Sequence, residues 1–132
     1  MIIEFHRGNI FEKTDYSFVK LVDDKKKLLK IKDTLTVCPH VAFGIYKKPL
    51  FGKKRWIFNV TDFELGLLEI IPHLNSNCIR HLAIDITKLK NKTQEEIRNI
   101  LKEIFKNNTI KIKCFESEKN AKQINKVTLE TN

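Results

Sequence analysis

The chain has 132 residues, of which 42% are hydrophobic and 31% are charged, and it carries a formal net charge of +9. These values are typical of one globular domain with its own core and exclude a disordered chain. No apolar run approaches the roughly 18 residues that cross a bilayer, and the N-terminal stretch MIIEFHRGN lacks the apolar core of a signal peptide. We therefore expect a single cytoplasmic domain over residues 1–132, with a frayed tail at 128–132 and no membrane partner.

The positive charge comes mostly from lysine: of the 25 cations, 21 are Lys and 4 are Arg. Bidentate recognition of phosphate or guanine favours the arginine fork, so this balance is unusual for a nucleic-acid reader. Abundant Lys, Ile and Asn with few Gly and Pro is also typical of an AT-rich coding sequence. We expect part of the net charge to reflect that bias.

The first 60 residues predict short strands, because β-branched and aromatic residues recur between polar turns. The expected strands are 2–6, 16–22, 28–37, 41–46 and 56–60. The sequence VDDKKK at 22–27 predicts a hairpin turn between the second and third of them. Pro49 and Gly52 interrupt the next polar stretch, which is expected to be an exposed hairpin loop.

From residue 60 the apolar period becomes helical. Thr61 and Glu64 have the spacing of a capping box, which predicts a helix that ends or bends near Pro72. Thr93 and Glu96 repeat that spacing before a second helix with an apolar stripe at i, i+3, i+4 and i+7. Strands are expected at 79–86 and 109–115, followed by a short helix after residue 117.

These elements predict an α+β fold in a single domain. N-terminal antiparallel β-strands continue into a β-α-β-α-β run over 56–115, with parallel right-handed crossovers. The result is a mixed sheet with helices packed on it.

The strongest functional signal is the stretch 46–56, YKKPLFGKKRW, which has five cations and no acid. Its cations could neutralise phosphates while its rings stack on unpaired bases, or its apolar tip could contact a protein. A solvated hairpin with Trp56 in the core is the simplest alternative. The candidate partner-binding residues are Tyr46, Lys47, Lys48, Leu50, Phe51, Lys53, Lys54 and Arg55.

The sequence contains no motif for catalysis, a metal or a cofactor. The four histidines are scattered, and Cys38 and His40 form the only close Cys–His pair, so we expect no metal site. There is no G-x-S-x-G and no glycine-rich phosphate loop, so we expect no cofactor and no catalytic residues. The three cysteines are expected to be buried free thiols: Cys38, Cys78 and Cys114.

One remote enzymatic alternative is a metal-dependent nuclease. Asp85 at a strand end, followed by Glu116, Glu118 and Lys119, is faintly similar to the acid and acid-x-Lys pattern of restriction-type endonucleases. A second acid stands where that pattern has Lys, and a helix separates the two strands. These acids more simply begin a last helix.

Two binding functions therefore remain. The first is a small non-catalytic protein that neutralises a toxin or enzyme by stoichiometric contact, as immunity proteins, antitoxins and inhibitors do. Its target would need a neutral or acidic surface, because this chain is basic. The second is a basic module that binds RNA or DNA, for which arginine is scarce and no known signature is present.

Overall fold

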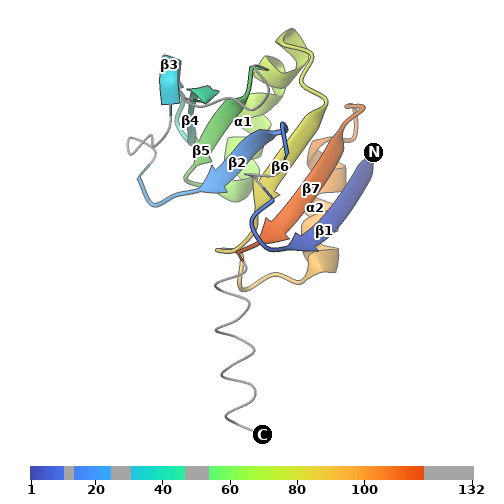
Figure 1. The fold of residues 1–132 in the computed structure, drawn as a ribbon. Helices are drawn as coiled ribbons and strands as arrows, with labels where there is room; N and C mark the ends of the chain where they lie inside the picture. Colours follow the sequence, from blue (N-terminus) through green and yellow to red (C-terminus); the bar gives the residue numbers. More distant parts are fainter. Residues whose placement is uncertain (11–13, 25–30, 47–53, 118–132) are drawn as a thin grey trace, which may run out of the picture.

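The computed structural model describes residues 1–10, 14–24, 31–46 and 54–117, in which seven strands form one mixed sheet with two helices packed on it (Figure 1). The strands are β1 (Ile2–Arg7), β2 (Ser17–Leu21), β3 (Ile31–Val37), β4 (Val41–Tyr46), β5 (Trp56–Val60), β6 (His81–Asp85) and β7 (Lys111–Glu116). The helices are α1 (Phe63–Ser76) and α2 (Gln94–Ile104). The predicted fold class, an α+β mixed sheet with helices packed on it, is confirmed.

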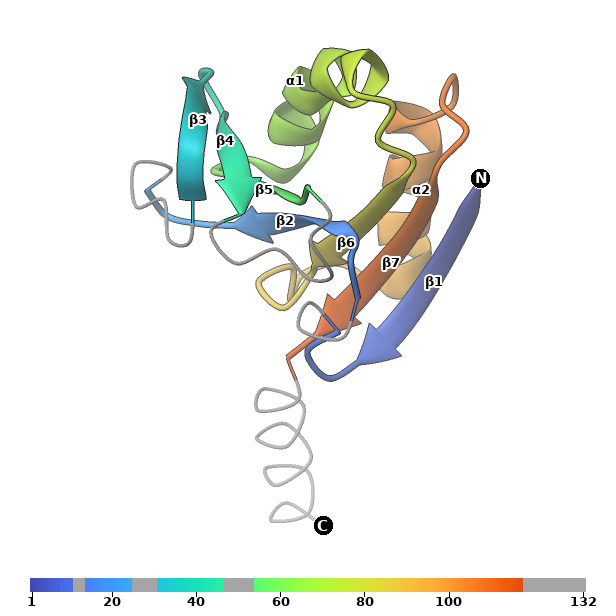
Figure 2. The same cartoon turned by 45° about the horizontal axis from the view of Figure 1, so that its top comes forward.

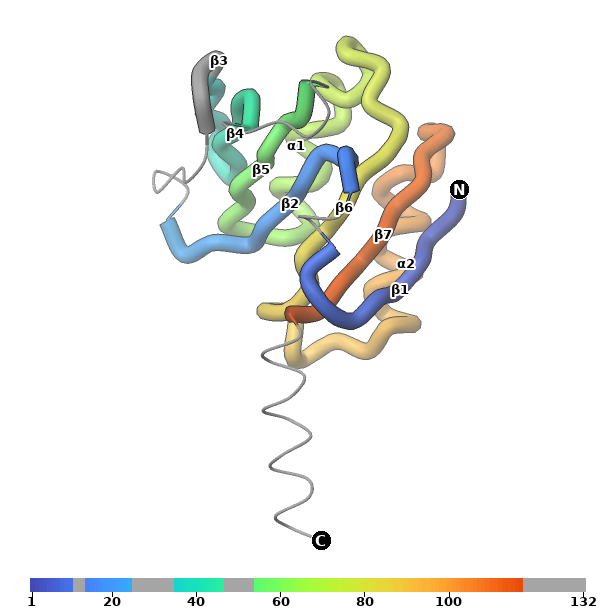
Figure 3. The backbone as a smooth tube through the Cα atoms, viewed as in Figure 1, coloured from blue at the N-terminus to red at the C-terminus, as the bar shows by residue number. Residues whose placement is uncertain are grey.

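The strand order is β1-β7-β6-β2-β5-β4-β3. The first five strands in this order, β1, β7, β6, β2 and β5, are parallel to one another. The remaining two, β4 and β3, extend the sheet with antiparallel pairing. The predicted parallel relation of β5, β6 and β7 is confirmed. Figure 3 shows the chain path, in which the first strand lies beside the last.

Two predictions about the N-terminal strands are wrong. β2 pairs in parallel with both β5 and β6, so the stretch 22–27 does not join β2 to β3 as a hairpin, and β1 is parallel to β7. The reason lies in the burial of β2, because Ser17, Phe18 and Val19 are all buried. A strand that is buried on both faces belongs in the middle of a sheet.

The two faces of the sheet are covered differently. Both helices lie on one face, here called the helix face (Figure 2). This is what crossovers of one hand produce when the chain advances in one direction from β5 to β7. On the opposite face, Ile10 and Tyr16 pack on a buried apolar cluster. That cluster consists of Phe18, Tyr46, Ile57, Ala83 and Phe115.

The helix face holds the larger core. Alternate residues of the strands pack there against the buried stripes of α1 and α2. As predicted, α2 begins at the N-cap Thr93, whose Oγ1 accepts a hydrogen bond from the Glu96 N–H at 3.1 Å. Its residues Ile97 and Leu101 are buried.

Helix α1 differs from its predicted limits at both ends. Its N-cap is Asp62, whose Oδ1 accepts from the Leu65 N–H at 2.9 Å, whereas Thr61 donates its N–H to the His40 carbonyl at 3.0 Å. The helix also continues past Pro72 to Ser76. Pro72 leaves the Leu68 carbonyl without its helical hydrogen bond, but both residues are exposed, so water can supply it.

Gly66 allows α1 to approach the β3–β4 turn closely. A Cβ at this position would lie 2.7 Å from the Val60 Cβ and 3.1 Å from the His40 carbonyl oxygen. Beside it, the His40 N–H donates to the Glu69 Oε1 at 2.8 Å, and the His40 ring nitrogen Nδ1 contacts the other carboxylate oxygen. The turn after β3 is therefore fixed to the first half of α1.

Replacing Gly66→Ala should lower the free energy of unfolding by about 1 to 2 kcal/mol. Alanine gains about 1 kcal/mol in helix propensity, but the rigid Val60 side chain and the backbone must move, and contacts of 2.7 Å place the overpacking cost at the upper end of its usual range, about 2 to 3 kcal/mol. Urea unfolding measures the difference. Leu68→Ala on the exposed side of α1 is the control, expected within about 0.5 kcal/mol of wild type. A Gly66→Ala protein as stable as wild type would contradict the close approach.

Candidate functional site

The basic stretch joins the ends of two paired strands. β4 and β5 are antiparallel with Ile45 opposite Trp56, and the Tyr46 N–H donates to the Arg55 carbonyl at 2.7 Å. The predicted connection between these two strands is thus confirmed. The predicted contact residues within it, Lys47, Lys48, Leu50, Phe51 and Lys53, lie outside the described residues, and their role stays a prediction.

Two residues at the ends of this stretch are buried, although its many cations predict an exposed loop. Arg55 is only 1% exposed, its Nε–H donates to the Tyr16 carbonyl at 2.9 Å, and its Cζ lies 5.2 Å from the centroid of the Tyr46 ring. Tyr46 is also buried, whereas Lys54 is exposed. Arg55 therefore ties the start of β5 to the segment before β2. Little of Arg55 or Tyr46 remains for contact with a partner.

Neighbouring cations of the stretch should respond differently to substitution. Arg55→Ala leaves the partly buried Tyr16 carbonyl without its donor and removes the cation over Tyr46, so we expect a loss of about 2 kcal/mol or more in unfolding free energy. Lys54→Ala should change it by less than about 0.5 kcal/mol. Chemical denaturation of both variants measures this. Equal stability of the two variants would mean that Arg55 is not the buried tie described above.

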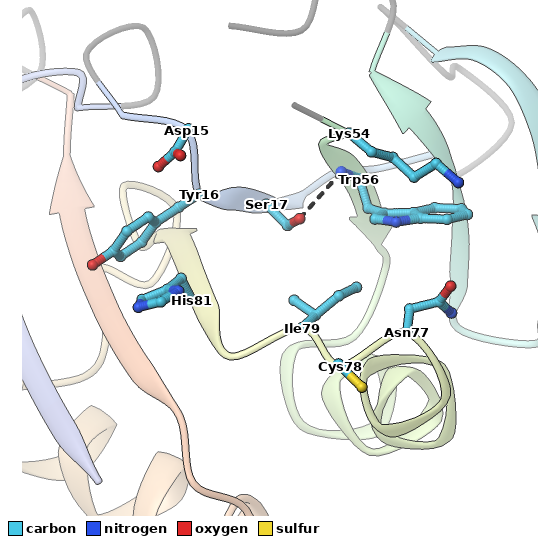
Figure 4. A pocket seen from close by; sticks show the side chains of 9 residues that line it. All are labelled: Asp15, Tyr16, Ser17, Lys54, Trp56, Asn77, Cys78, Ile79 and His81. Atoms are coloured by element: carbon cyan, nitrogen blue, oxygen red, sulfur yellow. Dashed lines mark hydrogen bonds between the residues drawn. The ribbon is translucent and has the colours of Figure 1, made fainter. Parts of the chain in front are cut away.

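A cavity of about 410 Å³ opens beside Lys54, at the amino ends of β2, β5 and β6 (Figure 4). Three separate parts of the chain bring its walls together: the start of β2, the start of β5, and the turn from α1 into β6. The lining residues are Asp15, Tyr16, Ser17, Lys54, Trp56, Asn77, Cys78, Ile79 and His81.

Three rings line this cavity, from Tyr16, Trp56 and His81, together with the Lys54 ammonium and the Asp15 carboxylate. The ring centroids of Tyr16 and His81 are 4.8 Å apart, and the Nζ of Lys113, which does not line the cavity, lies 4.8 Å from the Tyr16 centroid. Across the cavity, the Lys54 Nζ lies 5.7 Å from the centroid of the Trp56 ring. Such walls suit a group that is flat or anionic, because rings offer stacking surfaces and ammonium groups attract negative charge.

Trp56 is held from behind by His73 of α1. Its ring centroid is 4.2 Å from that of His73, which also lies 4.5 Å from the ring of Phe43. The Asn77 Nδ2 lies 3.2 Å from the His73 Nδ1, to which it can donate if that nitrogen is unprotonated. Burial lowers the pKa of His73 below its ordinary value of 6.5, because the imidazolium would lose hydration. This wall of the cavity is therefore built around a neutral imidazole.

The lowered pKa of His73 predicts a pH dependence of stability. The unfolded chain takes up the proton more readily than the folded one, so the contribution is fully present above pH 6.5 and is lost as the pH falls below it. His73→Gln should flatten the fall in unfolding free energy between about pH 7 and pH 5. The exposed His81→Gln is the control and should retain the fall. An unchanged pH profile in His73→Gln would contradict this assignment.

The remaining predicted residues are placed as follows. His40 pairs with Glu69 and so serves the fold. Burial raises the pKa of the Cys114 thiol to about 12, and Cys38 is half-buried. The prediction of burial is wrong for Cys78, which is exposed at the cavity. Within the described ranges, no group of three or more His, Cys, Asp or Glu side chains could hold a metal ion.

The acids of the nuclease alternative do not share a face. β6 and β7 are neighbours, so the helix between them does not keep the strands apart, contrary to the prediction. Asp85 is level with Phe115 in this pairing, and both lie on the opposite face. Glu116, the next residue, therefore points to the helix face. Glu118 and Lys119 lie outside the described residues.

The lining residues Tyr16, Asn77 and Cys78 could not be recognised as one site from the sequence. Tyr16 lies far in the chain from the consecutive residues Asn77 and Cys78, and no local motif joins them. The one available signal was that His81 occupies a polar position at the start of an otherwise apolar strand.

Comparison with known proteins adds no identity. No protein family matches this chain, and no curated protein is detectably similar to it. In the described part of the chain, neither helix combines the length and the apolarity needed to cross a bilayer.

Proposed function

We propose that this protein is a non-catalytic binding protein that acts by stoichiometric contact with another protein, in the manner of an immunity protein, antitoxin or inhibitor. One observation carries the proposal: Leu35 and Val37 are 55% and 53% exposed on β3, at the edge of the sheet. Large apolar side chains that remain exposed at a sheet edge favour contact with a partner.

The geometry of β3 supports this choice. Leu35 and Val37 are two positions apart in the strand, and Leu35 lies where the register between β3 and β4 shifts, between Asp33 and Thr36. β3 pairs with β4 along one edge, and no strand of the described chain pairs along its other edge. β4 leads directly into the basic stretch, whose sequence contains the predicted tip residues Leu50 and Phe51.

The distribution of charge supports a partner with an acidic surface. The described residues contain nearly equal numbers of cations and acids, so almost all of the net charge of +9 belongs to residues 11–13, 25–30, 47–53 and 118–132. Two of these lysine-rich stretches directly flank β3 and β4 in the chain. Complementary charge would steer an acidic partner towards this part of the protein.

The test is capture of partners from the host lysate with tagged wild type, Leu35→Asp, Val37→Asp and the control Leu68→Asp. Leu68 is 49% exposed on α1, so it matches the exposure of the test positions on another surface. We expect wild type and Leu68→Asp to retain one nuclease-resistant protein near one-to-one. Both β3 variants should retain at least tenfold less, because a buried carboxylate is costly at an apolar contact.

Two results would contradict the proposal. One is loss of the partner in Leu68→Asp with retention in both β3 variants, which would move the contact to α1. The other is recovery of no stoichiometric protein at all. Circular dichroism of each variant checks that the fold is retained.

A nucleic-acid-binding module is the second candidate, and the cavity of Figure 4 is the observation that favours it. The rings of this cavity and Lys54, which belongs to the stretch 46–56, suit an unpaired base and its phosphate. In this case the same capture would recover nucleic acid that nuclease removes. The amount recovered would fall steeply as the salt concentration rises. Neutralising Lys47, Lys48, Lys53 and Lys54 would then abolish recovery, while the buried Arg55 is left unchanged.

A further inference from the structure

Three polar side chains form one row across the opposite face of the sheet. Lys20 on β2 is level with Asp85 on β6 and with Asn59 on β5. Two residues earlier in these strands stand Phe18, Ala83 and Ile57, which belong to the buried cluster of the opposite face. Because side chains alternate along a strand, Lys20, Asp85 and Asn59 point to this same face.

Asn59 is a buried donor that lacks an acceptor. Its side chain is 2% exposed, and its Nδ2 has no hydrogen-bond partner. It is the one such buried side-chain atom within the described residues. Buried polar groups in proteins are nearly always hydrogen-bonded, and an unsatisfied one commonly marks a bound water, ion or ligand.

Lys20 is a second donor beside it. Lys20 is half-buried, and within the described part of the chain it makes no ion pair or hydrogen bond. Asp85 on its other side already accepts the Thr87 N–H at 2.9 Å through Oδ1. Two neighbouring donors, one of them charged, therefore face the same side of the sheet without an acceptor between them.

The position of this row is suited to a ligand. Lys20 and Asn59 are each one residue before the end of their strands, and Asp85 is the last residue of β6. The row thus lies at the carboxyl ends of three adjacent parallel strands, the edge where open sheets with parallel strands bind their ligands. A water molecule could satisfy the Asn59 amide, but an anion would satisfy it and also pair with the Lys20 ammonium, which makes no ion pair within the described part of the chain.

We infer that Lys20 and Asn59 form a binding site for a small anion, namely a carboxylate or phosphate group, at the carboxyl ends of β2 and β5. One oxygen of the anion accepts from the Asn59 Nδ2, and its charge is balanced by the Lys20 ammonium. The Asp85 carboxylate beside Lys20 accepts a hydroxyl or amine proton of the same ligand. This site is separate from β3 and from the cavity of Figure 4, so its test is independent of the proposed function.

The experiment is an NMR titration of the ¹⁵N-labelled full chain with inorganic phosphate and with acetate, at constant ionic strength held with sodium chloride. We expect the Asn59 side-chain NH₂ signals to move in a saturable way with at least one of the two anions. Lys20→Met should weaken the apparent affinity at least tenfold. Lys88→Met is the matched control, because Lys88 is an exposed cation at the same edge, 4.0 Å from Asp23, and should leave the affinity unchanged.

Asn59→Leu provides a second test that does not depend on the lysine. It should fold, because leucine replaces an unsatisfied buried donor with an apolar group of similar size, and it should lose the response to the anion. The inference is overturned if neither anion moves the Asn59 signals in a saturable way. It is also overturned if Lys20→Met and Asn59→Leu bind as wild type does.

Discussion

The parallel pairing of β2 on both of its edges is the constraint on which the rest of the structure depends. Ser17, Phe18 and Val19 are buried in succession, so this strand needs cover on both faces and a neighbour on both sides. β5 and β6 must then separate to admit it, and α1 spans the gap between them on the helix face. Ile10 and Tyr16, which precede β2 in the chain, pack on the apolar cluster of the opposite face.

The cavity of Figure 4 and the row of Lys20, Asp85 and Asn59 both depend on the position of β2 between β5 and β6. At its amino end, β2 carries Ser17 to the cavity, where its Oγ accepts from the Trp56 N–H at 3.1 Å. Near its carboxyl end, β2 carries Lys20 between Asp85 and Asn59. The opposite ends of one strand thus organise the ring-lined cavity and the row of Lys20, Asp85 and the unsatisfied Asn59. The exposed apolar side chains of β3 belong to a third region, the antiparallel end of the sheet.

The sequence predicts local structure here better than pairing. The limits of β4 and β5 and the Thr93 cap of α2 depend on neighbouring residues, and they were predicted correctly. The partners of β2 could not be predicted, because the alternation of a short strand is compatible with a hairpin and with a central parallel position. Its consecutive buried residues were the one local sign of the second arrangement.

The candidate site was harder to predict than the fold for the same reason. Arg55 lies in a run of cations that is typical of an exposed loop, yet a distant carbonyl and the ring of Tyr46 hold it in the interior. In the sequence, Asn59 is an ordinary polar residue of a strand. Only its register beside Lys20 indicates that it could be part of a binding site. Contacts between residues far apart in the chain determine both the burial of Arg55 and the neighbours of Asn59. Composition does not predict such contacts.

The position of β2 can be measured directly from backbone nuclear Overhauser effects in a uniformly labelled sample. The structure predicts cross-strand contacts from Val19 to both Phe58 and Ile84, its register partners on β5 and β6. Contacts between β2 and β3 across a hairpin at 22–27, with none from Val19 to those two residues, would contradict the account.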